Sequence, residues 1–295
     1  MGRAAVLVAL AACGPPPKPR PSGAHAQLSL AADARMVTVP AGQYISGSTP
    51  EERLAAYDDF FTTAGNDTAR EHKWFDNEED RHVARLPTFR IDLMPVTQVE
   101  YAEFVNAGRA PRPSIDEGAW KAQGFKQDYQ TEVTRYVWQD VHPPHGREDH
   151  PVVLVTHTEA ESYCAWRGEL AGAKRRLPSA EEYEKASRGE AGFAYPWGQT
   201  YEADKLNSRV QGPGDTTPAG AYSNGASPFG VLDLAGNVFQ WTATAAPSGD
   251  KMLVKGSAWE DWAGLGRGAS SHGRHRGARH VIVGFRCAAD VAEPQ

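Results

Sequence analysis

Apolar and polar residues follow one another in short patterns along this chain, with many turn residues between them. Residues 36–39 and 43–46 alternate apolar and polar side chains on either side of a Pro-Ala-Gly turn, which predicts a β-hairpin. Apolar residues recur at helical spacing after Thr97, Thr156 and Ser179, which predicts three short helices, and the last two caps precede a Glu by three residues, as in a capping box. Because we find no βαβ alternation, long repeat or heptad pattern, we expect an α+β fold with much irregular structure.

Composition narrows the class of protein. Of the 295 residues 40% are hydrophobic, and eight Trp, ten Tyr and ten Phe supply more aromatic surface than a disordered chain leaves exposed. No apolar run approaches the length of about 18 residues that a membrane helix needs, which excludes a bundle of membrane helices. The net charge of −6, without a Lys/Arg block, indicates no nucleic-acid partner. The acidic residues of segment 50–80 are typical of a solvated surface segment.

The N-terminus has the pattern of an export signal. One Arg precedes a short apolar run, and Leu10-Ala11-Ala12-Cys13 resembles a bacterial lipobox, after which Cys13 would carry a lipid. We expect a signal peptide at 1–13, a Pro-rich linker at 14–35 and one globular domain at 36–292. The protein would then be exported and lipid-anchored to the cell envelope, at the outer membrane or on the periplasmic face. The alternatives are an ordinary signal peptide with an incidental Cys and a misassigned start.

Seven phrases in the chain resemble the formylglycine-generating enzyme family, also called the sulfatase-modifying factor family. The resemblance implies one compact domain related to C-type lectins, mixed α/β and low in regular structure. It also implies an oxidase that converts a sulfatase cysteine to formylglycine with oxygen and a copper(I) ion bound by two thiolates. The phrases, in order, are VPAGQYISGS, FRIDLMPVTQVEYAEFVNAG, HPVVLVTHTEAESYCAWRG, RRLPSAEEYEKASRGEAGFAYPWG, SPFGVLDLAGNVFQWT, VKGSAW and VGFRCAAD, spread over residues 39–290.

The groups that perform this chemistry are missing from the chain. The positions of the two copper-binding cysteines hold Asp261 and Gly266, and the position of the active-site Ser holds Ala258. Copper(I) requires soft ligands, so we do not expect copper. Iron, which relatives hold by His and carboxylate, is not expected either, because the histidines of this chain are better explained as loop residues. The favoured function is a non-catalytic binding or accessory role. The alternative is an oxidoreductase, either a formylglycine-generating oxidase or a non-haem iron variant.

The cysteines and histidines are candidates for a disulfide or for metal binding. The chain has three cysteines; Cys13 is expected to be lipidated, and Cys164 and Cys287 form either a disulfide or two buried thiols. Two histidine trios share the spacing H-x2-H-x4-H, namely His142, His145 and His150, and His272, His275 and His280. Neither spacing places three imidazoles on one helical face, so ordinary loop histidines are the favoured interpretation.

The resemblance also implies calcium as a candidate ion. Calcium takes hard oxygen ligands. There are two candidate sets of calcium ligands. The first contains Gln240 where relatives carry Glu, and this replacement weakens calcium binding; the second depends on Asp215 as a substitute for the acidic ligand. The two sets are Gly236, Asn237, Val238 and Gln240, and Asn207, Ser208 and Asp215.

Segment 267–286 is locally basic and contains no acidic residue. One hypothesis is a groove that binds an anionic glycan, a phosphate or a carboxylate; the other is that its arginines tie the chain to acidic loops such as 78–80. Expected partners are therefore an anionic glycan or an envelope protein, together with the membrane through the lipid anchor. The candidate anion-binding residues are Arg267, Arg274, Arg276 and Arg279.

Overall fold

The computed structural model describes residues 26–247 and 249–291. The lipobox with Cys13 and most of the Pro-rich segment lie outside the described residues, so their assignment stays a prediction. Within the described ranges, no helix has both the length and the apolar character required to span a membrane.

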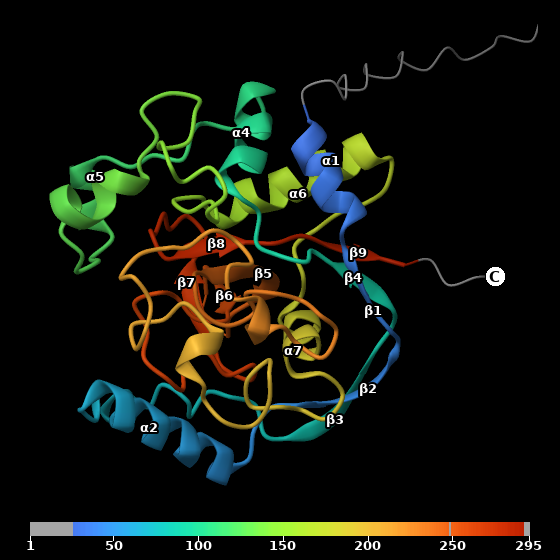
Figure 1. The fold of residues 1–295 in the computed structure, drawn as a ribbon, viewed down its shortest axis with the longest axis vertical. Helices are drawn as coiled ribbons and strands as arrows, with labels where there is room; N and C mark the ends of the chain where they lie inside the picture. Colours follow the sequence, from blue (N-terminus) through green and yellow to red (C-terminus); the bar gives the residue numbers. More distant parts are fainter. Residues whose placement is uncertain (1–25, 248, 292–295) are drawn as a thin grey trace, which may run out of the picture.

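Three small sheets form the centre of the structure (Figure 1). All neighbouring strands are antiparallel except β5 and β8, which run parallel. The three-stranded sheet has the order β1 (Val37–Val39), β4 (Phe89–Ile91) and β9 (Ala288–Asp290). The two-stranded sheet pairs β2 (Gly42–Ser46) with β3 (His82–Leu86). The four-stranded sheet has the order β7 (Ser271–His275), β6 (Lys251–Lys255), β5 (Phe239–Ala245) and β8 (Val283–Phe285).

The predicted β-hairpin is wrong in its pairing. Both predicted strands exist as β1 and β2, but they do not pair with each other: Val39 lies opposite Phe89, and Gly42 lies opposite Leu86. Segment 37–46 therefore runs as one interrupted arm antiparallel to segment 82–91. Pro40 has no N–H to donate to a ladder, which interrupts the arm instead of reversing it.

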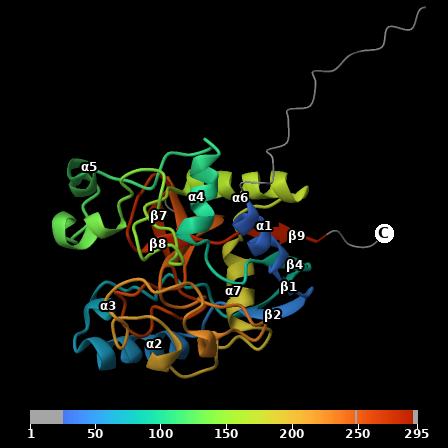
Figure 2. The same cartoon turned by 45° about the horizontal axis from the view of Figure 1, so that its top comes forward.

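Seven α-helices within residues 26–247 and 249–291 surround the sheets. Helices α1, α4 and α6 gather on one side of the four-stranded sheet and α2 lies on the other, as two views show (Figures 1 and 2). The helices are α1 (Gln27–Ala34), α2 (Pro50–Ala64), α3 (Thr68–Glu71), α4 (Gln98–Asn106), α5 (Glu117–Ala122), α6 (His157–Ala171) and α7 (Ala180–Arg188). A π-helical turn at Tyr129–Val133 and short 3-10 turns at Thr134–Tyr136, Ala203–Lys205 and Ser223–Gly225 complete the helical segments.

Capping boxes fix the start of the longer helices. The three predicted helices are confirmed as α4, α6 and α7, whose caps Thr97, Thr156 and Ser179 each accept a hydrogen bond from the N–H three residues on. A fourth box, at Thr49 with Pro50 in the first turn, begins α2 inside the acidic segment. The prediction of a merely solvated segment is thus wrong, because Tyr57 and Phe60 of α2 are buried and Glu78 forms a buried pair with Arg267.

The main core lies between α4, α6 and strands β5 and β8, and it consists largely of aromatic rings. The ring of Tyr163 lies 5.4 Å from Phe285 and 5.7 Å from Trp166. Trp241 is fully buried and its Nε1 donates to the carbonyl of Val155 at 3.1 Å. The large rings that the sequence places beside tight turns differ in burial, since Trp241 is a core residue and Trp197 is only half-buried.

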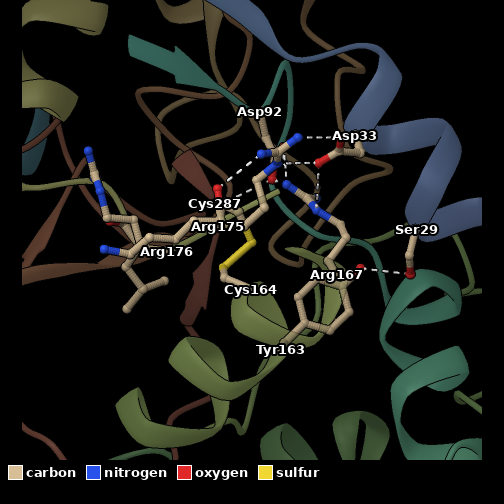
Figure 3. Close-up of a disulfide and its surroundings, with 11 residues drawn as sticks. Ser29, Asp33, Asp92, Tyr163, Cys164, Arg167, Arg175, Arg176 and Cys287 are labelled. Atoms are coloured by element: carbon tan, nitrogen blue, oxygen red, sulfur yellow. Dashed lines mark hydrogen bonds and ion pairs between the residues drawn. A yellow bond between two sulfur atoms is a disulfide. The ribbon is translucent and has the colours of Figure 1, made fainter. Parts of the chain in front are cut away.

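A disulfide joins α6 to the residue that precedes β9 (Figure 3). It links Cys164 to Cys287, with Cα atoms 5.6 Å apart, and so selects the disulfide over the alternative of two free thiols. The backbone N–H of Cys287 donates to Asp92 Oδ2 at 2.7 Å. Asp92 in turn accepts hydrogen bonds from both terminal nitrogens of Arg167 on α6, at 2.6 and 3.0 Å.

Helix α1 belongs to the domain, so the prediction of a linker at 14–35 is wrong for residues 27–34. Asp33 accepts two hydrogen bonds from Arg175, at 2.5 and 2.7 Å, and Ser29 Oγ lies 3.0 Å from the hydroxyl of Tyr163 (Figure 3). The carboxylate of Glu103 accepts the first N–H groups of the helix, from Leu28 and Ser29. The helix is held by buried polar groups instead of an apolar stripe, and hydrophobic periodicity detects only the stripe.

We expect Asp33→Ala to destabilise the domain by about 3 kcal/mol, because it leaves the buried guanidinium of Arg175 without its carboxylate. Urea unfolding measures this change. The matched control is Asp67→Ala, which removes an exposed pair with Arg70 and should change the free energy of unfolding by less than about 1 kcal/mol. Equal effects of the two substitutions would show that α1 is not part of the stable domain.

Candidate functional site

Two adjoining cavities surround Asp261, in the loop between β6 and β7. Their volumes are about 470 Å³ and about 210 Å³, and both are lined by Trp74, Glu260, Asp261 and Leu265. We call the two together the Asp261 cleft. The remaining lining residues are Phe60, Asn66, Thr68, Lys126, Gln127, Glu132, Arg209 and Trp262 in the larger cavity and Phe239, His272, Arg274 and Ile282 in the smaller one.

One wall of the cleft comes from the acidic segment. In α2, Tyr57 and Phe60 are buried against Phe75 and Leu265, which seats the segment on the loop that carries Asp261. Trp74 meets Phe60 edge to face, with ring centroids 5.4 Å apart, and borders both cavities. Sequence reasoning missed this wall. The Thr49 capping box and the apolar spacing of α2 were the available signal.

The Asp261 side chain closes a tight turn. Its Oδ2 accepts the N–H of Ala258 at 2.7 Å, and its own N–H donates to the carbonyl of Ala258 at 3.0 Å. These reciprocal bonds hold the carboxyl at one place in the cleft wall. Burial, with a smaller contribution from the nearby charge of Glu260, raises the pKa of Asp261 to about 7. Near neutral pH the Asp261 carboxyl can therefore donate a proton in a hydrogen bond or accept one.

Glu260 is the second carboxyl of the cleft. Burial raises its pKa as well, and Gln127 Nε2 donates to both of its oxygens, at 2.9 and 3.0 Å. The cleft wall thus carries two adjacent carboxyl groups, and burial disfavours the charged form of each.

Strand β7 contributes His272 and Arg274 to the smaller cavity. Burial, with Arg274 nearby, lowers the pKa of His272 to about 4, so the imidazole is neutral at pH 7. Within the described residues, three buried atoms of the cleft lining have no hydrogen-bond partner: His272 Nε2, Arg274 Nε and Gln127 Oε1. Unsatisfied buried polar atoms are energetically costly, and a ligand that bonds to them removes the cost.

The family model of the FGE-sulfatase family, described as a sulfatase-modifying factor enzyme 1-like domain, matches residues 24–291. The chain belongs to this family. It is 30% identical over 314 residues to inactive C-alpha-formylglycine-generating enzyme 2 of Mus musculus, which covers 91% of this chain and 90% of that protein. It is 29% identical over 263 residues to hercynine oxygenase of Mycolicibacterium smegmatis, covering 77% of this chain and 59% of that longer protein.

Solved structures share the fold. The structure of PvdO from Pseudomonas aeruginosa superposes with a TM-score of 0.62 at 22% identity, covering 87% of this chain and 94% of that chain. Treponema denticola variable protein 1 superposes with a TM-score of 0.59 at 16% identity. The expected single α+β domain of the formylglycine-generating type is thereby confirmed.

The residues at the family's copper positions do not fit copper(I). Asp261 offers a hard oxygen that is already bonded to a backbone N–H. Gly266 is buried, and a Cβ placed there would lie 3.1 Å from Ser257 Oγ and 3.4 Å from the Ala235 Cβ, so its position is packed and not open to an ion. The cysteines Cys164 and Cys287 are joined to each other. No thiolate therefore reaches the cleft from the described part of the chain.

The two histidine trios do not converge. His145 is fully exposed, and His150 Nδ1 lies 2.8 Å from Thr216 Oγ1. His275 is exposed, whereas His280 is buried with its ring centroid 3.9 Å from that of Phe125. Within residues 26–247 and 249–291, no three His, Cys, Asp or Glu side chains come together in a way that could hold a metal.

The expected calcium ligands lie close together but are committed to other groups. Gln240 donates to the carbonyl of Asp233 and accepts Arg286 Nε, at 2.7 and 2.5 Å. Asp215 pairs with Arg147 and Arg135, so its carboxylate is already neutralised by two cations. These side chains do not form a ready calcium cage, and calcium binding stays a prediction. The same region contains Ser208, Gly236 and Val238, and an Asn207 Oδ1 without a partner among the described residues.

The four arginines of the proposed anion groove are not brought together as a free basic surface. Arg267 is buried and donates to both oxygens of Glu78, at 2.9 and 3.1 Å, which is the internal tie that the alternative hypothesis described. Arg279 pairs with Glu159. Arg276 is exposed and lines none of the cavities described above. Of the four, Arg274 alone borders the Asp261 cleft.

We expect Asp261→Asn to raise the stability of the domain at pH 7–8 and to leave it nearly unchanged at pH 4. The pKa of the folded carboxyl lies above its ordinary value of 3.8, so the unfolded chain ionises first and wild-type stability falls as pH rises from about 4 to about 7. The amide cannot ionise and still accepts the N–H of Ala258. Thermal unfolding across this pH range measures the slope. Asp250→Asn, at an exposed residue, is the control, and an unchanged slope in Asp261→Asn would contradict the assignment.

Proposed function

We propose that this protein is an exported, lipid-anchored member of its family that binds a glycan in the Asp261 cleft and has a binding role instead of oxidase chemistry. The observation that carries the proposal is the set of unpartnered buried atoms that line the cleft beside Trp74, next to Asp261, where the resemblance puts one of the two catalytic thiolates. Unpartnered polar atoms and an aromatic ring favour a recognition site, whereas Asp261 offers a hard oxygen that does not suit copper(I).

The chemistry of the lining matches a sugar ring. Sugar hydroxyls both donate and accept hydrogen bonds, and the cleft offers a donor in Arg274, an acceptor in Gln127 and a carboxyl in Asp261 that does either near neutral pH. The C–H face of a sugar packs against an aromatic ring, which Trp74 supplies at the junction of the two cavities. Ligand sites of this size combine apolar surface with a few placed polar groups. An envelope protein stays the other predicted partner.

The relatives support both this function and its alternative. The relative in Mus musculus, similar over nine tenths of both chains, is named inactive. The relatives named hercynine oxygenase keep an oxidoreductase as the second candidate. A purified protein that retains copper or iron and consumes oxygen with a cysteine-containing sulfatase peptide would establish the second candidate. The same assay with an unmodified peptide cysteine and no oxygen uptake would support the first.

We expect Cys13 to carry the lipid anchor. Cells grown with an alkyne-labelled fatty acid should label the wild-type protein in the membrane fraction, and Cys13→Ser should abolish the label because no other described cysteine is free. Gly23→Ser, outside the lipobox, is the matched control and should keep the label. Labelling of Cys13→Ser equal to that of the wild type would rule out the anchor.

We expect the full chain, solubilised in detergent, to bind neutral bacterial envelope oligosaccharides, and Trp74→Ala to weaken that binding by on the order of tenfold, since a ring-stacking contact is lost. Titration calorimetry on the best oligosaccharide of a glycan array measures the effect. Phe61→Ala is the control, because Phe61 lies on α2, is 49% exposed and does not line the cleft. Glu260→Gln, which preserves shape, should also weaken binding.

The outcomes separate clearly. Loss of binding in Trp74→Ala and Glu260→Gln with retention in Phe61→Ala supports the cleft as the glycan site. Equal binding by all three variants would place any glycan elsewhere and overturn the proposal. A matching thermal unfolding midpoint for Glu260→Gln and the wild type shows that the loss does not come from unfolding.

A further inference from the structure

A third cavity, of about 510 Å³, lies beside the edge strand β7 and shares Arg274 with the Asp261 cleft. Lys251 at the start of β6 and His275 at the end of β7 also line it. We call it the Lys251 pocket. Its remaining lining residues are Ala122, Gln123, Phe125, Gly273, Gly277 and Ala278.

Three basic side chains line this pocket, and no carboxylate is found among its described lining residues. The Asp261 cleft differs, since its cations are mixed with Glu132, Glu260 and Asp261. Within the described chain, neither Lys251 nor Arg274 forms an ion pair with a carboxylate. The Asp261 and Glu260 carboxyls of the adjoining cleft act on the charge of Arg274 from a longer distance, and its buried Nε has no hydrogen-bond partner. Arg267 and Arg279, by contrast, are each paired.

The register of the sheet brings two of the basic groups together, whereas Arg274 alternates to the other face of β7 and reaches the pocket at the sheet edge. Lys251 lies directly opposite His275 on the β6–β7 ladder, and Met252 lies opposite Arg274. Basic side chains directly opposite each other on a ladder repel when both are charged, and here no described acid of the pocket compensates them. An anion bound between them removes this repulsion and completes the charge balance.

Loop contacts hold the opposite wall of the pocket in place. Gln123 accepts the N–H of Arg279 at 2.9 Å and donates to its carbonyl at 3.4 Å. The ring of Phe125 packs at 5.0 Å from Trp120 and 3.9 Å from His280. The wall is therefore set by the fold, and the pocket is present before any ligand arrives.

We propose that the Lys251 pocket binds the oxyanion of an acidic glycan, a carboxylate, sulfate or phosphate group, while the sugar ring that bears it lies in the Asp261 cleft. The placement of the sugar ring rests on the proposed function, and the placement of its acidic group rests on the basic lining of the Lys251 pocket. Arg274 borders both spaces, so one side chain contacts both parts of the ligand. The anionic partner expected from the sequence thus binds through Lys251, Arg274 and His275 and not through Arg267, Arg276 or Arg279.

The pocket is tested first with inorganic sulfate alone, titrated into the full chain and followed by calorimetry. Lys251→Ala and Arg274→Gln should each weaken sulfate binding by about tenfold. Arg276→Ala removes a neighbouring exposed cation that does not line the pocket, and it should leave sulfate binding unchanged. An equal loss in all three variants would mean general attraction to surface charge and would overturn the proposal, as would no loss in any of them.

The link to a glycan is tested with glucuronate against glucose, a pair that differs in the acid group. The wild type should bind glucuronate more tightly by about tenfold, and Lys251→Ala should erase this preference without weakening glucose binding. Trp74→Ala should weaken both sugars and leave sulfate binding intact. If Trp74→Ala did not weaken sugar binding while the other results held, the proposed function would be refuted and an anion pocket would remain. An absent preference for glucuronate would refute the glycan link and make a free inorganic anion the occupant.

Discussion

The buried carboxylate of Asp92 holds together segments that are far apart in the chain. It pairs with Arg167 on α6 and accepts the N–H of Cys287, while Arg167 also lies 3.6 Å from Asp33 on α1 (Figure 3). Burying two charges costs free energy that their attraction offsets only when the remaining hydrogen-bonding positions are also filled. The backbone N–H and the two nitrogens of the guanidinium fill those of Asp92. Together with the disulfide, this network fixes α1, α6 and β9, and the short sheets alone could not.

The same principle positions the candidate site. The strands have three to seven residues, so ladder hydrogen bonds leave long loops to be held by other means. Glu78 and Arg267 form a buried pair that joins the acidic segment to the loop of Asp261. Glu184 on α7 pairs with Lys255 at the end of β6, where that loop begins. The acidic segment and the 256–270 loop are thus joined by the first of these buried ion pairs and by the apolar contacts of Tyr57, Phe60 and Leu265, and not by a sheet.

Sequence patterns predicted the parts of the fold that depend on local chemistry. The caps Thr97, Thr156 and Ser179 marked three real helices because a capping box is satisfied within four residues. Helix α1 was missed because it depends on Asp33 meeting Arg175, 142 residues away, which no local pattern records. Only one wall of the cleft was predicted, because the resemblance pointed to Asp261. The wall with Trp74 was missed, because the many acidic residues of its segment indicated a solvated surface. The pair of Arg267 with Glu78 is the tie to the acidic loop 78–80 that the sequence offered as an alternative.

The replacement of sulfur by a carboxyl at position 261 changes what this cavity can recognise. Two thiolates would hold a soft cation through negative charge. A carboxyl whose pKa lies near 7, beside a second carboxyl whose pKa burial also raises, carries only part of a charge and exchanges hydrogen bonds with neutral groups. The positive charge of Arg274 then lies at the border between this cleft, where carboxyl groups are mixed with cations, and the basic Lys251 pocket. A ligand that is neutral along most of its length and acidic at one end fits both cavities: its neutral part suits the Asp261 cleft and its acidic end suits the Lys251 pocket.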